Sequence, residues 1–222
     1  MIASSNRAVI CTPHAEASAA GMRVLDAGGT AIDAMLAASA MLGAVFPHMT
    51  GLGGDALWMI HDDKVRTIVG IGQAGQRLPD GGAITLRGPG SVATTAGALA
   101  SWQLAAQISR QQWGSKLGWA DVLEDAAFRA DAGSPVSQSQ LFWQTLRQPL
   151  IAQLPDLQPL CMTEGRWLRE GDSLRQPQLA DTLRHLALHG VQDFYQGELA
   201  QAFANHLHRR ARNADATSHH RL

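Results

Sequence analysis

The sequence predicts an α+β or layered α/β/α protein in which helices predominate. Two helical segments, 15–27 and 30–45, precede two short apolar runs, 55–61 and 65–69. The short polar connection between these runs is typical of a β-hairpin. From residue 91 onward the pattern is mostly helical. This order of elements predicts a small sheet covered by helices.

The segment before the hairpin is predicted element by element. A short apolar run, 8–11, indicates a strand. Helix 15–27 ends at Gly28-Gly29, which favours a helix C-terminus. Thr30 is then the expected N-cap of the second helix, with Asp33 completing a capping box three residues later.

The second helix is apolar almost all round and rich in small side chains, which predicts that it is buried. Its apolar stretch, 31–46, is 16 residues long and contains Asp33. That is short for a membrane span, so no membrane association is expected.

The remaining helices follow a loop over 70–90 that is rich in glycine and proline. They are expected over 91–110, 119–132, 138–147, 176–188 and 193–208. After Leu207 the chain offers almost nothing to a core. Residues 1–208 are therefore expected to form one domain, and 209–222 to be a disordered or foreign tail.

Composition excludes several classes of protein. The 222 residues are 45% hydrophobic and 17% charged, which is too apolar for disorder. The formal net charge of −1 gives no electrostatic case for nucleic-acid binding. Cys11 and Cys161 fit no metal or redox spacing, and no signal peptide precedes the first helix. A cytoplasmic protein without a metal is expected.

Two patterns that mimic functional motifs are better explained structurally. The stretch 70–75 matches G-x-G-x-x-G, but turn residues follow it where a dinucleotide site needs a helix, and no ribose-binding acid lies nearby. His185 and His189 lie one helical turn apart without a third ligand, and His189 suits a helix C-terminus. Neither a nucleotide cofactor nor a metal is expected.

The most informative stretch is 47–55, which contains His48, Gly51, Gly53, Gly54 and Asp55. Three glycines in four residues indicate either close backbone approach or positive φ angles. Such a turn can direct backbone N–H groups toward an anion. A tight connection between helix and strand explains the pattern equally well.

Together these segments resemble the N-terminal part of the gamma-glutamyltransferase (glutathione hydrolase) family, over about residues 7–208. The similarity lies in 13–17, 21–25, 28–34, 47–55, 88–92, 113–114, 119–123, 130–137 and 194–200. In these the chain is similar to the family patterns GGNAVDAA, EPHSSGIGGG, VPGSV and FYxGELA.

The resemblance implies an N-terminal-nucleophile (Ntn) hydrolase fold, a four-layer αββα sandwich, of which only the helix-rich large-subunit part is present. In that family a precursor cuts itself, and the new N-terminal threonine attacks a gamma-glutamyl amide. An acyl-enzyme then passes its acyl group to water or an amino acid. The implied partners are the C-terminal small subunit and a small acyl substrate, with no cofactor.

The chain departs from the family pattern at its end. The nucleophilic threonine belongs to a Thr-Thr-His motif downstream, so no catalytic residue is assigned within 1–222. The chain alone is expected to be inactive, to fold poorly and to expose apolar surface. A catalytically inactive, truncated remnant or partner-binding fragment is the alternative.

A second departure concerns the substrate. Ile71 stands where the resemblance implies an arginine that binds the α-carboxylate of a gamma-glutamyl group. An aliphatic side chain cannot pair with a carboxylate. Gln73 and Arg77 are the candidate substrate-binding residues, and the turn His48–Asp55 borders the expected acyl pocket. A solvent-exposed loop position explains Gln73 equally well. An acylase acting on a glutaryl or cephalosporin-type group is the other alternative.

Overall fold

The computed structural model describes residues 2–4, 8–74 and 94–218, together with residues 84, 86 and 91; side chains are described in these ranges from residue 8 to residue 209. The elements in chain order are β1 (Ile2–Ser4), β2 (Val9–Cys11), α1 (Ala15–Asp26), α2 (Ala31–Val45), β3 (Ala56–His61), β4 (Val65–Gly70), α3 (Ala98–Gln111), α4 (Trp119–Ala132), β5 (Ser134–Pro135), α5 (Gln138–Ile151), η2 (Gln158–Leu160), β6 (Met162–Thr163), β7 (Arg166–Trp167), β8 (Ser173–Leu174), α6 (Pro177–His189), α7 (Asp193–Gln196) and α8 (Glu198–Ser218).

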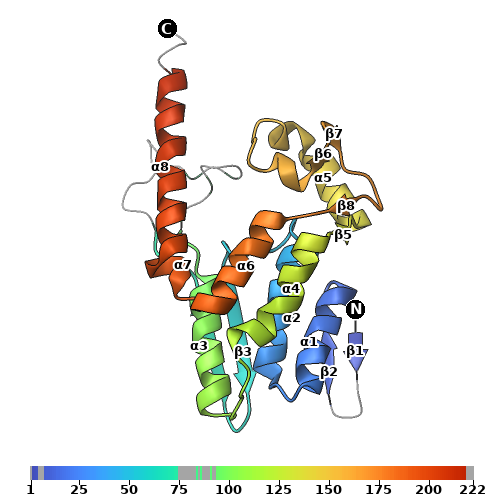
Figure 1. Cartoon of the computed structure of the whole chain (residues 1–222), viewed down its shortest axis with the longest axis vertical. Helices are drawn as coiled ribbons and strands as arrows, with labels where there is room; N and C mark the ends of the chain where they lie inside the picture. Colours follow the sequence, from blue (N-terminus) through green and yellow to red (C-terminus); the bar gives the residue numbers. More distant parts are fainter. Residues whose placement is uncertain are drawn as a thin grey trace.

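The body of the molecule is a layer of helices with the β3–β4 hairpin beside it (Figure 1). Helix α2 contacts α1 on one side and α4 on the other, and α4 contacts α6. The hairpin packs against α3. The predicted α+β class with predominant helices is confirmed.

Helix α2 is the centre of the core, as its apolar sequence predicts. Eleven of its fifteen residues are buried, including Leu36 at 1% exposure. Burial of one leucine side chain stabilises a fold by about 1.5–3 kcal/mol. No helix among the described residues is long and apolar enough to cross a membrane.

The capping box at the start of α2 is confirmed and extends further than its pattern predicts. The Asp33 carboxylate accepts hydrogen bonds from the Thr30 backbone N–H at 2.9 Å and from the Ser109 hydroxyl at 2.8 Å. Asp33 and Ser109 are both buried, at 2% and 0% exposure. The cap therefore also ties α2 to α3, 76 residues later in the chain.

Residues 134–174 form a small lobe beside the body, containing α5 and the β6–β7 pair (Figure 1). Its own apolar cluster comprises Val136, Leu168 and Leu174, with Leu141 packed against it. The β5–β8 pair joins the lobe to α4 and α6. The short strands of this lobe lack the alternating run that predicts strands, and the sequence does not reveal them.

Helices α3, α5 and α7 have boundaries that differ from expectation. Helix α3 begins at Ala98 rather than 91, because residues 94–97 contact the chain after β4 instead. Helix α5 continues to Ile151, with Pro149 inside its last turn. The expected helix 193–208 is divided at Gly197, whose backbone is extended.

The last helix, α8, continues to Ser218, ten residues beyond its expected end. Alanine and arginine in 209–218 are strong helix formers. The expectation of a tail rested on the absence of apolar residues, which a helix does not need in order to form. The assignment of 209–222 as a separate tail stays a prediction.

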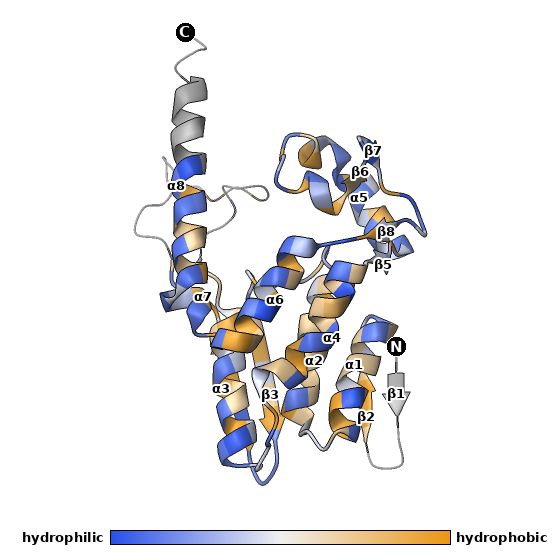
Figure 2. Ribbon diagram, viewed as in Figure 1, coloured by the Kyte–Doolittle hydropathy of each residue, from blue (hydrophilic) through white to orange (hydrophobic). Residues whose placement is uncertain are grey.

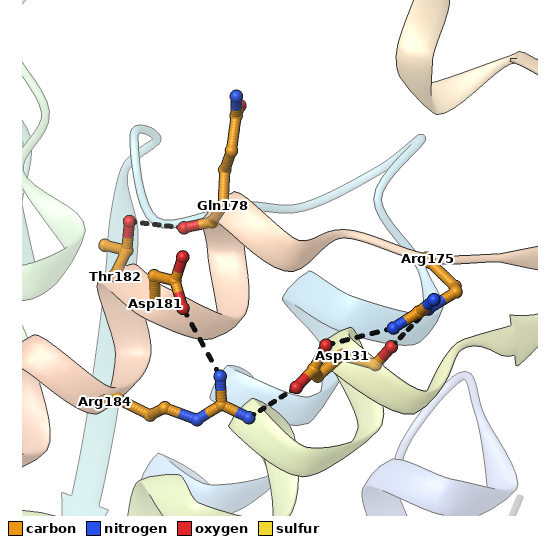
Figure 3. Close-up of polar contacts among 6 residues, drawn as sticks. All are labelled: Asp131, Arg175, Gln178, Asp181, Thr182 and Arg184. Carbon is orange, nitrogen blue, oxygen red and sulfur yellow. Dashed lines mark hydrogen bonds and ion pairs between the residues drawn. The ribbon is translucent and has the colours of Figure 1, made fainter.

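Charged side chains clamp α4, α6 and the connection between β8 and α6 (Figure 3). Asp131, on α4, accepts hydrogen bonds from Arg184 at 2.7 Å and from Arg175 at 3.2 Å. Arg184 also pairs with Asp181 at 3.3 Å. The Arg184 guanidinium, more than any other neighbour, holds the pKa of the Asp131 carboxyl below its ordinary value.

This clamp predicts a pH-dependent stability. Because the folded-state pKa of Asp131 is lowered, its contribution is present above the unfolded pKa and is lost as the pH falls through the folded value. Asp131→Asn is expected to lower the melting temperature near neutral pH; the difference should shrink as the pH falls below about 4 and vanish only below the lowered folded-state pKa. Thermal melts from pH 7 to pH 2.5 measure this. Asp181→Asn, at a 78% exposed side chain, is the matched control with little expected effect. A pH-independent difference would contradict the explanation.

Candidate functional site

Two segments that the sequence singled out, the 51–55 turn and the loop after β4, meet at the N-terminus of α3. The Gly54 carbonyl accepts hydrogen bonds from the backbone N–H groups of Gly97 at 3.0 Å and Ala98 at 2.9 Å. The turn therefore satisfies two N–H groups that a helix start leaves without an intrahelical partner. This contact fixes the turn on the body of the molecule.

The loop after β4 lies against the same segment. The Gln73 backbone N–H donates to the Thr95 hydroxyl at 3.1 Å, and its carbonyl accepts from the Thr95 N–H at 2.9 Å. Ala74 and Thr94 continue this as an antiparallel bridge. The backbone of Gln73 is thus held in place, while its side chain is exposed.

Glycines make this close approach possible. A Cβ on Gly72 would overlap the Thr95 carbonyl, and one on Gly97 would overlap the Gly70 carbonyl. A Cβ on Gly70 would lie 2.8 Å from the Gly97 carbonyl oxygen. Two glycines of the G-x-G-x-x-G stretch therefore allow close backbone packing between β4 and α3. This agrees with the structural explanation of the stretch, in which it is not a nucleotide site. The third, Gly75, lies outside the described residues.

Tyr195, the only tyrosine in the sequence, holds the segment from the other side. Its hydroxyl donates to the Ala96 carbonyl at 3.0 Å and accepts from the Ala100 N–H at 2.9 Å. Burial raises the pKa of its phenol, so it stays a donor at neutral pH. Sequence reasoning missed Tyr195 and Thr95, whose roles depend on contacts across 95 and 22 residues.

A small pocket of about 230 Å³ opens where these segments meet. Ile71, Gln73, Thr95, Leu104 and Tyr195 are among its lining residues. Ile71 is 53% exposed and Leu104 is 51% exposed. The described part of this wall therefore combines apolar side chains with one amide and the hydroxyls of Thr95, Ser101 and Tyr195, and it presents no cation to a substrate carboxylate.

The glycines of the 51–55 turn show neither the positive φ angles nor the close backbone approach that the sequence suggests for them. None of Gly51, Gly53 and Gly54 has a positive φ. No atom lies within 4 Å of a Cβ built on Gly51 or Gly53, and Gly51, Gly53, Gly54 and Asp55 are all exposed. Among the backbone groups of these glycines, within the described residues, only the Gly54 carbonyl hydrogen-bonds to the start of α3.

The other two candidate positions lie apart. The His48 side chain is directed toward α5, where its Nε2 lies 3.0 Å from the Ser139 hydroxyl. Its ring lies against Phe46, with centroids 4.2 Å apart, and burial lowers the pKa of its imidazole. Arg77 lies outside the described residues. The structure therefore joins Gly54 to the region of Gln73 and places His48 at a different pocket.

His185 has a structural role, as expected. Its Nε2 lies 2.9 Å from an Asp193 carboxylate oxygen, and its ring lies tilted against that of His189 with centroids 4.3 Å apart. Asp193 in turn accepts from the Leu199 N–H at 3.0 Å at the start of α8. Among the residues with described side chains, no three His, Cys, Asp or Glu side chains form a metal-binding group.

Comparison with solved structures defines the class of fold. The chain matches the transpeptidase enzyme CapD of Bacillus anthracis with a TM-score of 0.72 at 27% identity, over 89% of this chain and 64% of that chain. It matches cephalosporin acylase from Bacillus halodurans with a TM-score of 0.72 at 30% identity, over 84% of this chain and 36% of that chain. The fold is that of the large-subunit part of the N-terminal-nucleophile hydrolases, as expected.

The family follows from the sequence match. Residues 17–219 match the gamma-glutamyltranspeptidase family, and the chain belongs to it. It is 37% identical to the glutathione hydrolase-like YwrD proenzyme of Bacillus subtilis, over 90% of this chain and 38% of the relative. It is 36% identical to the oxamate amidohydrolase proenzyme of Klebsiella pneumoniae, over 90% of this chain and 39% of the relative. The chain thus spans about two fifths of these relatives.

Proposed function

We propose that this chain is the large-subunit portion of an amide hydrolase or acyltransferase whose nucleophilic threonine lies in a separate C-terminal portion. Both similar relatives are proenzymes that extend well beyond the matched region. In this arrangement the pocket at Gln73 is one wall of the acyl site. The nucleophile and the oxyanion-binding N–H groups come from the other portion.

The exposed face of the β3–β4 hairpin is the observation that carries this proposal. Leu57, Met59, Val65 and Val69 point away from α3 and are 60–79% exposed. The opposite face, which includes Trp58 and Ile60, packs against the helical core. Figure 2 shows the apolar colouring of β3. Strands that are apolar on both faces are typical of a sheet covered on both sides, and the C-terminal portion provides the second cover.

Gly51 and Gly53 also support the proposal that a separate C-terminal portion completes the site. Neither φ angles nor neighbours within the described residues require glycine at these positions. Both lie on the turn that docks beside Gly97, next to the proposed acyl site. Their lack of side chains leaves room for the C-terminal portion or the substrate to approach the backbone.

For the substrate, we propose a small carboxylate amide of the oxamate type rather than a gamma-glutamyl compound. A gamma-glutamyl group carries an α-carboxylate and an ammonium, and Ile71 offers no charge to pair with either. Oxamate carries one carboxylate and no ammonium, and the Gln73 side-chain amide can donate a hydrogen bond to that carboxylate. The oxamate amidohydrolase at 36% identity supports a small acyl group.

The decisive substitution is Ile71→Arg in the complete enzyme. It is expected to raise kcat/KM for γ-glutamyl-p-nitroanilide at least tenfold, because a bidentate arginine–carboxylate pair contributes about 1.5–3 kcal/mol. Ile71→Met is the matched control and should leave this activity unchanged. Equal activities of the wild type and Ile71→Arg toward this substrate would refute the proposal that residue 71 lies where the α-carboxylate binds.

Two observations test whether the nucleophile lies in a separate C-terminal portion. The DNA that follows codon 222 should encode, in one of its three frames, a Thr-Thr-His motif of the kind that the resemblance implies. The purified 222-residue chain should release no ammonia from oxamate. If the chain alone turns over, the nucleophile lies within it; if no frame encodes the motif, the chain is an inactive remnant.

A glutaryl or cephalosporin-type acylase is the second candidate. The apolar side chains of Ile71 and Leu104 at the pocket, and the fold match to a cephalosporin acylase, favour it. Comparing glutaryl-p-nitroanilide with oxamate as substrates of the complete enzyme separates the two candidates. Faster turnover of the glutaryl compound would select the acylase.

A further inference from the structure

A second cavity lies away from the proposed acyl site, between the body and the small lobe. It has a volume of about 520 Å³, within the range of small-molecule sites. The body supplies Pro47, His48 and Met49, just after α2. The lobe supplies one face of α5 and part of the segment 157–161. Junctions between two structural units are common places for ligand sites.

The wall of this cavity is mainly apolar. Trp143, Leu150, Ile151 and Leu160 line the lobe side. Ile151 is buried at 7% exposure, while Trp143 and Leu150 are half-buried. Such a wall favours a ligand with a compact apolar or aromatic body, since burial of apolar area drives its transfer from water.

Two amides of the wall are tied to the lobe. The Gln140 amide donates to the Leu160 carbonyl at 3.0 Å, and the Gln144 amide donates to the Leu168 carbonyl at 2.9 Å. These bonds fix α5 on the lobe, while Gln144 Oε1 and His48 Nδ1 are buried without a hydrogen-bond partner among the described residues. His48 adds no charge near neutral pH, because burial lowers the pKa of its imidazole.

Arg147 supplies the positive charge of the cavity wall. It is the only charged residue among the described residues that line the cavity. Its guanidinium carbon lies 5.3 Å from the centroid of the Trp143 ring. Stacking uses the face of the guanidinium, and the N–H donors lie in its plane, where they suit a planar carboxylate. No carboxylate side chain appears among these lining residues to compete for it.

We propose that this cavity between α5 and residues 47–49 binds an apolar carboxylate. Arg147 binds its carboxylate, and the apolar side chains of the lobe contact its body: Trp143, Leu150, Ile151 and Leu160. This site is separate from the Gln73 pocket and does not depend on the nucleophile. Its test therefore measures binding rather than turnover, and it fails or succeeds independently of the proposed function.

The experiment is isothermal titration of the complete enzyme with 4-phenylbutyrate and with 4-phenylbutanol, which has the same body without the charge. Saturable binding of the acid, at least tenfold tighter than that of the alcohol, is expected. Titration with N-acetyl-Ala-Ala-Phe and its C-terminal amide shows whether a peptide terminus also fits. Tighter binding of either acid than of its uncharged partner supports the proposal.

Three variants complete the test. Arg147→Gln should weaken binding of the acid at least tenfold and leave the alcohol unchanged. Arg169→Gln, at an exposed arginine of the same lobe outside the cavity, is the control and should change neither. Met49→Trp, at a 58% exposed position on the cavity wall, should block both ligands without disturbing the core. Circular dichroism confirms that each variant is folded. No saturable binding of either acid, or equal binding by wild type and Arg147→Gln, would overturn the proposal.

Discussion

Replacing Gly97 with alanine is expected to lower the free energy of unfolding by about 3 kcal/mol, the upper part of the range for overpacking. The new Cβ would overlap the Gly70 carbonyl, and it would also lie 2.9 Å from the Gly72 nitrogen. These are backbone atoms, which cannot rotate away as the end of a flexible side chain can. The N-terminus of α3 must then separate from the end of β4.

The matched control is Gly53→Ala, where no atom lies within 4 Å of the added Cβ. Urea unfolding of both variants, followed by circular dichroism, gives the comparison. The control should stay within about 0.5 kcal/mol of the wild type. A Gly97→Ala midpoint as high as that of Gly53→Ala would show that β4 and α3 are not in close contact.

Asp33→Ala is expected to cost about 3 kcal/mol of stability. The substitution removes a capping box, worth about 1 kcal/mol, and a charge-assisted hydrogen bond to the buried Ser109 hydroxyl, worth about 1.5–3 kcal/mol, which leaves Ser109 only its contact with the Thr30 hydroxyl at 2.7 Å. Because the carboxylate joins α2 to α3, the loss affects packing between two helices as well as the start of one.

The exposed capping carboxylate of α4 provides the comparison. Asp121 accepts from the Gly118 N–H at 2.7 Å and has an exposed side chain. Asp121→Ala should therefore cost only about 1 kcal/mol. Urea midpoints measure both variants. If the two substitutions cost the same, the bond between Asp33 and Ser109 contributes nothing beyond the cap.

Local patterns in the sequence predicted most of the elements because their causes are local. The Thr30–Asp33 box, the Gly28 stop and the polar hairpin turn each lie within a few residues of the boundaries that they set. Helix α4 matches its predicted range of 119–132. The family motifs are likewise contiguous, and the resemblance drawn from them is confirmed.

The candidate site was only partly predictable. Sequence reasoning selected Gln73 and Gly54, but it had no means of finding Thr95 or Tyr195, which hold the same loop from distant parts of the chain. It expected the start of α3 at 91, because the helical pattern does not reveal that residues 94–97 contact the chain after β4. The glycines at 70 and 72 were recognised as a loop, while their partner Gly97 was not.

The sequence by itself determined the class of fold, the family and the buried position of α2, because hydrophobic period, capping residues and contiguous motifs encode them locally. Tertiary structure alone decided that the 51–55 turn caps α3, that His48 lies against α5, and that the hairpin keeps an uncovered apolar face. The physical reason is that backbone packing at Gly70, Gly72 and Gly97 and hydrogen bonds across many residues depend on contacts that no local pattern contains.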